Sequence, residues 1–178
     1  MAAARASLRA LSLSPSLAVV FERANALALG GWIALALGRA LEGGKPSRAR
    51  VRHACERVVS LVVWTQCVAY ATLLIRLVLR GASDLDASEA SFSSLAGVQA
   101  LFRCAGAACA GWIHYLAFDL VVGRGLVEYE RECGVPAWLT IATTVPLTFL
   151  AGPVGFAWSG VVSRAFDAAR ARREKKRA

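Results

Sequence analysis

Charged residues are scarce in this chain of 178 residues: they make up 19% of it, against 57% hydrophobic residues. The mean hydropathy of +0.50 is higher than a water-soluble domain needs. So apolar a composition excludes an intrinsically disordered chain. The apolar residues also come in four long blocks instead of the one-sided stripes of a soluble helix, which argues against a soluble enzyme.

The five cysteines do not fit a disulfide-rich secreted domain, because their number is odd and three of them lie inside apolar blocks. No set of His, Cys, Asp and Glu has the spacing of a metal site, and Cys104 and Cys109 would make a poor chelate. The sequence has neither a glycine-rich phosphate loop nor a nucleophile elbow. We therefore expect no metal and no cofactor.

Negative charge is the scarcer sign, since 12 Asp and Glu stand against 21 Lys and Arg, for a net charge of +9. In a soluble protein this excess would suggest a nucleic-acid partner. Here the basic residues lie mainly between and after the apolar blocks, where anionic lipid headgroups would meet them. We therefore expect membrane lipids as partners, and no nucleic acid.

Each apolar block is about as long as the roughly 20 residues that a helix needs to cross a hydrocarbon core about 30 Å thick. Helices are the expected form, because lipid offers backbone groups no hydrogen-bond partner outside the segment. The sequence therefore predicts an all-α membrane protein, a bundle of four transmembrane helices. Their expected ranges are 17–38, 58–79, 104–122 and 138–163.

The fourth block carries residues that weaken a helix. Pro146 and Pro153 each lack an amide donor, and Gly152 adds flexibility. We expect a kinked last helix here, packed inside the bundle, where neighbouring helices cover the freed carbonyls. The alternative interpretation is a plain kink without functional meaning, since Gly and Pro are common in membrane helices.

Two segments flank the expected membrane domain at 17–164. Residues 1–16 are basic and Ser-rich, a composition compatible with an organelle transit peptide. Residues 165–178 are a basic tail, expected as an exposed helix near anionic headgroups. With four crossings, both termini lie on the same side of the membrane. The distribution of Lys and Arg among the loops and tails favours the cytoplasm-like side for both termini. The short, basic first loop argues for the opposite orientation.

Ionisable groups inside a membrane are costly and are therefore candidates for function. The third block holds His114 and Asp119, with Tyr115 on the same helical face as Asp119. His114 and Asp119 are about 140° apart around the helix, so they point to different faces. Arg124 lies near the membrane edge, from where its long side chain can reach back to neutralise Asp119.

Two interpretations of these residues stay open. In the structural one, Asp119 pairs with Arg124 or a loop arginine, and His114 bonds a backbone carbonyl or Gln66. In the functional one, His114 and Asp119 line a polar pocket for an oxygenated, lipid-soluble substrate, since a neutral imidazole can donate or accept a proton. The other candidates for lining such a pocket are Trp112, Asn25, Gln66 and Tyr70.

The run from Trp112 to Arg124, WIHYLAFDLVVGR, resembles the signature of the abscisic-acid-deficient-four-like, or neoxanthin-synthase-like, family of membrane proteins. Similar stretches at Phe21–Leu37, at SFSSL from Ser91 and at GPVG from Gly152 extend the likeness to about residues 17–164. The resemblance implies a four-helix integral protein, in a plastid membrane in a photosynthetic eukaryote and otherwise in the cytoplasmic membrane. From the plant members it also implies conversion of the xanthophyll violaxanthin to neoxanthin.

Our first hypothesis is therefore an intramembrane isomerase that opens a carotenoid-like epoxide to an allenic alcohol. This opening needs an acid at the epoxide oxygen and a base at the neighbouring carbon. We assign His114 as acid or base, Asp119 as its electrostatic partner, and Tyr115 as a donor. The alternative is a non-catalytic protein that binds pigment or lipid, or that supports a membrane complex as a homo-oligomer or with a membrane-protein partner.

Overall fold

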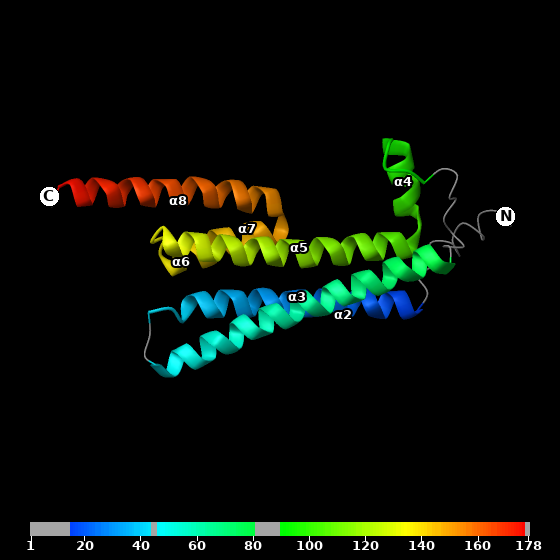
Figure 1. The fold of residues 1–178 in the computed structure, drawn as a ribbon, viewed down its shortest axis with the longest axis horizontal. Helices are drawn as coiled ribbons and strands as arrows, with labels where there is room; N and C mark the ends of the chain where they lie inside the picture. Colours follow the sequence, from blue (N-terminus) through cyan, green and yellow to red (C-terminus); the bar gives the residue numbers. More distant parts are fainter. Residues whose placement is uncertain (1–14, 44–45, 81–89, 177–178) are drawn as a thin grey trace. The chain divides into compact units, whose positions relative to one another are not determined.

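The computed structural model describes residues 15–43, 46–80 and 90–176. Every element in these ranges is a helix, which confirms the all-α prediction. The expected N-terminal segment 1–16 lies almost entirely outside the described residues, as do the last two residues of the basic tail. The elements are α2 (Pro15–Ala40), α3 (Pro46–Arg80), α4 (Leu95–Arg103), α5 (Ala105–Glu132), α6 (Ala137–Leu139), the π-helix η1 (Thr140–Thr144), α7 (Val145–Leu150) and α8 (Gly152–Lys175) (Figure 1).

Three helices are long and apolar enough to cross a membrane: α2, α3 and α5. They contain 26, 35 and 28 residues. At 1.5 Å per residue all three exceed a hydrocarbon core about 30 Å thick. They also expose large apolar side chains that water would not favour, such as Trp64 at 71% and Val78 at 75%. The chain is therefore a membrane protein, and its first three apolar blocks are its candidate spans.

The fourth block is divided into two arms, where we expected a single kinked helix over 138–163. The helical conformation stops at Ala151, whose φ is −155° and ψ is 78°. The arm over 137–150 extends only about 21 Å, and the apolar part of α8 before Arg164 is shorter still. Neither arm reaches across a hydrocarbon core of about 30 Å, so a fourth crossing at this block is not confirmed.

The two arms form an antiparallel hairpin, in which α8 returns along α7 and η1 (Figure 1). Gly155 lies against the backbone of Thr148, and the Trp158 indole nitrogen donates to Thr143 Oγ1 across 2.8 Å. Moving forward along α8 therefore corresponds to moving backward along the first arm, which is the register of a tight helical hairpin.

The residues expected to kink the fourth block each have a local role in this hairpin. Pro146 follows η1, and the wider π-turn relieves the clash that its ring would make with the carbonyl four residues earlier. Pro153 lies in the first turn of α8, where a missing amide costs nothing. Gly152 begins α8, and a Cβ there would come within 2.5 Å of Asp119 Oδ1.

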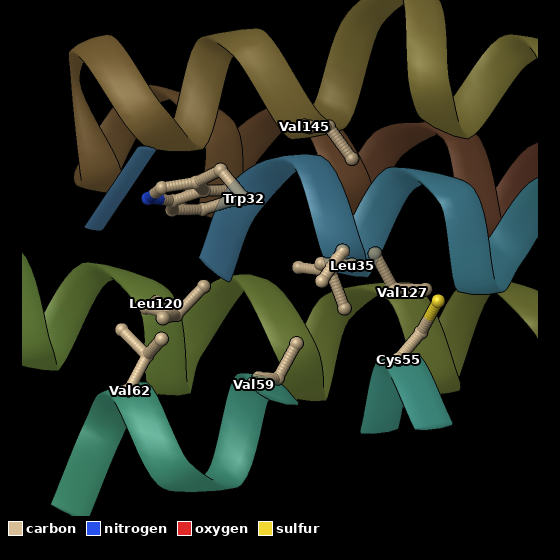
Figure 2. Packing of buried hydrophobic residues seen from close by; sticks show 9 residues of the cluster. Trp32, Leu35, Cys55, Val59, Val62, Leu120, Val127 and Val145 are labelled. Carbon is tan, nitrogen blue, oxygen red and sulfur yellow. The ribbon is translucent and has the colours of Figure 1, made fainter. Parts of the chain in front are cut away.

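The chain divides into two compact units. Unit 1 comprises Met1–Leu27 and Trp64–Leu116, and unit 2 comprises Ala28–Val63 and Ala117–Ala178. The apolar core of unit 2 contains residues of α2, α3, α5 and α7, with Leu120 fully buried among them (Figure 2). Small residues allow this packing: a Cβ on Gly31 would come within 2.6 Å of Leu120, and one on Gly123 would overlap the Trp32 ring.

Candidate functional site

Trp112 is the centre of a polar and aromatic cluster in unit 1. Its indole nitrogen donates to Asn25 Oδ1 across 2.9 Å and so joins α5 to α2. The Asn25 amide nitrogen donates in turn to the Phe21 carbonyl at 2.9 Å. The rings of Phe21 and Tyr115 flank the indole, with centroid distances of 5.9 Å and 5.5 Å. Both ends of the Asn25 amide are therefore used, and the orientation of the indole is determined.

Two further predicted residues lie on α3 in the same unit. Gln66 is 1% exposed, and its amide nitrogen donates to the Ala24 carbonyl across 3.2 Å. The Tyr70 ring lies 5.2 Å from the His114 ring, centroid to centroid. The structure therefore brings together in unit 1 the expected pocket residues Trp112, Asn25, Gln66 and Tyr70, together with His114 and Tyr115.

An open groove of about 510 Å³ lies beside this cluster, between α2, α4 and α5. Its walls are aromatic and small apolar residues, and Phe102 of α4 packs against Gly111, where a Cβ would come within 3.1 Å of the ring. Among the lining residues Tyr115 carries a hydroxyl group, whereas the Trp112 N–H already donates to Asn25. The groove therefore suits a long apolar molecule that carries an oxygen function. The residues that line it are Phe21, Phe102, Ala105, Ala108, Cys109, Gly111, Trp112 and Tyr115.

Asp119 belongs to unit 2, not to the unit that holds His114 and Tyr115. Its carboxylate lies beside Gly152, the first residue of α8. A helix N-terminus carries partial positive charge and favours a carboxylate at this place. Arg124, the expected charge partner, donates to Ser60 Oγ across 3.2 Å. The geometry therefore supports a structural role for Asp119 at the start of the hairpin.

A row of fully buried polar residues in unit 2 was missed by the sequence analysis. Glu130 on α5 accepts a hydrogen bond of 2.6 Å from Thr144 Oγ1. In the sequence, the residues with hydroxyl groups are spaced four apart on both arms. This spacing indicates a buried row only when the register of the hairpin is known. Among the residues that the structure describes, no three His, Cys, Asp or Glu are grouped to hold a metal ion. The buried polar residues of the row are Glu130, Thr140, Thr144, Thr148, Ser159 and Ser163.

Comparison with known proteins places this architecture in a family. The family model described as ABA DEFICIENT 4-like matches residues 19–158, which include the three candidate spans, the groove and most of the hairpin. Neither the curated proteins nor the solved structures contain a significant match to the chain. Because the family model covers most of the 178 residues, this chain is a membrane protein of the ABA DEFICIENT 4-like (ABA4-like) family.

Proposed function

We propose that this protein binds an oxygenated carotenoid in the groove of unit 1 and isomerises its epoxide to an allenic alcohol. The observation that supports the proposal most is the groove itself, with about 510 Å³ of space beside aromatic rings. Phe102 and Trp112 are 58% and 41% exposed, so the groove is open at the surface of unit 1, where a lipid-soluble molecule would enter. A xanthophyll combines a long apolar body with oxygen functions, which matches this lining.

The reaction needs no co-reactant, because substrate and product have the same atoms. A proton leaves the carbon next to the epoxide, the ring C–O bond breaks, and the epoxide oxygen gains a proton. Tyr115 lines the groove and would donate to the epoxide oxygen. His114, the next residue on α5, would take the proton from carbon; its ring lies beside Tyr70 and outside the groove lining, so the scheme requires it to turn toward the substrate. The two groups then exchange that proton before the next turnover. Asp119 has no direct role in this scheme, because it lies in unit 2.

The test is pigment analysis of a violaxanthin-accumulating host that expresses the chain. Wild type should form neoxanthin, and Tyr115→Phe and His114→Ala should each lower its formation by about 100-fold, the usual contribution of an acid or base. Ala108→Phe should block the groove, whereas Val121→Phe, at an exposed position of the same helix, should leave product formation unchanged. Absence of neoxanthin with the wild-type protein would contradict the isomerase.

The second candidate is pigment or lipid binding without turnover. It is favoured by one observation: His114 is exposed beside Tyr70, and neither ring is among the residues that line the groove. Purified protein would then carry unmodified pigment in a fixed ratio, and Ala108→Phe would remove it while His114→Ala would not. Protein that retains no pigment or lipid in any variant would contradict this second candidate.

A further inference from the structure

Glu130 is a carboxyl group buried without a cationic partner. Its side chain is 0% exposed, and its Oε1 accepts from Thr144. Its Oε2 is buried as well, and it has no hydrogen-bond partner among the residues that the structure describes. Within those same residues, no Lys, Arg or His forms an ion pair with it. A charge removed from water is costly unless something of opposite charge compensates it.

Hydroxyl groups gather around the same position because of the hairpin register. Gly155 lies opposite Thr148, so four residues further along α8 Ser159 comes opposite Thr144, the residue bonded to Glu130. Thr140, four residues before Thr144, continues the row on the first arm. Ser159 and Thr140 are both 0% exposed.

The hydroxyl oxygens of Ser159 and Thr140 resemble Glu130 Oε2 in their burial and in their hydrogen bonding. Each is buried, and neither finds a hydrogen-bond partner in the described part of the chain. Buried hydroxyls without partners are rare, because each loses its hydrogen bonds to water without replacement. Glu130 Oε2, Thr140 Oγ1 and Ser159 Oγ are three such oxygens. The hairpin register brings both hydroxyls near the level of Thr144, the partner of Glu130, where one ligand would contact all three.

The chemistry of these oxygens selects the ligand. One carboxylate and neutral hydroxyls are hard donors, which suit alkali and alkaline-earth cations and not the softer transition metals. One negative charge balances one positive charge. We propose that Glu130, Thr140, Thr144 and Ser159 form a site for a small monovalent cation, with sodium as the occupant. The π-helix η1 contributes Thr140 and Thr144, and π-turns within helices are frequent at functional sites.

Sodium-dependent stability of the purified full chain in detergent tests this site. Thermal unfolding is followed while sodium chloride replaces choline chloride at constant ionic strength. Wild type should show a saturable rise in the unfolding midpoint with sodium. Glu130→Gln, which keeps the shape and the Thr144 bond, should lose the rise, whereas Glu132→Gln, at an exposed position of the same helix, should keep it.

Ser159→Ala is the second variant, and it leaves the carboxylate in place. It should raise the sodium concentration for half-maximal stabilisation on the order of tenfold, because one ligand is lost. The proposal is overturned if wild type unfolds at the same temperature in sodium and in choline. It is also overturned if Glu130→Gln retains the sodium response of the wild type.

Discussion

Cys133 shows how the fold changes the chemistry of a single residue. It follows α5 directly and is 6% exposed, and its thiol donates to Asp167 Oδ2 of α8 across 3.4 Å. Burial first, and then the hydrogen bond to Asp167, raise the pKa of the Cys133 thiol above its ordinary value of 9.0. Because the thiolate is the nucleophile, Cys133 should react slowly with alkylating agents at neutral pH.

Asp167→Asn should lower the pKa of Cys133, because it removes the carboxylate that stabilises the protonated thiol. Alkylation of Cys133 by iodoacetamide, followed by peptide mass spectrometry, should therefore begin at a lower pH in this variant. Asp167→Glu keeps the charge and should retain most of the wild-type profile. Identical profiles for wild type and Asp167→Asn would show that the carboxylate does not act on the thiol.

At the scale of an element, the close packing of the two arms of the hairpin depends on Gly155. A Cβ on this residue would overlap the backbone of Thr148, which cannot move without separating the two arms. Gly155→Ala should destabilise the protein by about 3 kcal/mol, the upper range for overpacking a core. Gly160 is the matched control on α8, because a Cβ there meets nothing within 4 Å. Gly160→Ala should be neutral or stabilising by up to about 1 kcal/mol.

Chemical unfolding of the two alanine variants in detergent micelles measures this difference. A hairpin that tolerates both substitutions equally would mean that α7 and α8 are not in close contact. Pro146 and Pro153 are tolerated in the hairpin because of their positions. Both lie at helix starts created by the π-turn and by the break at Ala151, so neither interrupts an α-helix.

At the scale of the whole molecule, the hairpin bears on which side of the membrane the connections and the tail of unit 2 lie. Arg39, at the end of α2, is 5% exposed and donates to Glu42 and to the Val135 carbonyl, so the α2–α3 and α5–α6 connections lie at the same end of unit 2. We expect neither arm of the hairpin to cross the membrane, because each is too short, and the tail should then emerge on that side too. The sequence analysis placed the first loop and the tail on opposite sides of the membrane, because it expected four crossings.

With three crossings, positive charge would gather on one side of the membrane, as the positive-inside rule favours. Single cysteines replacing Arg48 and the exposed Arg172, in a chain without other cysteines, should be labelled by an impermeant maleimide only after the membrane is permeabilised. A cysteine ahead of α2 should be labelled in intact cells, because α2 crosses once. Labelling of Arg48→Cys and Arg172→Cys from opposite sides would show that the fourth block crosses.

Much of the fold was predictable because lipid imposes strict rules on a sequence. An uninterrupted apolar stretch of the right length must become a helix there, so the spans at α2, α3 and α5 could be read from composition alone. Trp112, Asn25, Gln66 and Tyr70 could be selected because polar or amphipathic side chains inside apolar stretches are unusual. The structure groups these four residues in unit 1, but of the four only Trp112 lines the groove, so the expected pocket stays a prediction.

The hairpin and the partners of its residues could not be predicted in this way. Hydropathy treats 138–163 as one apolar block, because it does not register that Ala151 turns the chain back. Asp119 and His114 are five residues apart on one helix, yet they belong to different units. The sequence analysis did not select Glu130, although the fold buries it completely. Helix formation is a local property that composition controls, whereas burial of a polar group depends on which distant segment packs against it, and that is known only from the folded chain.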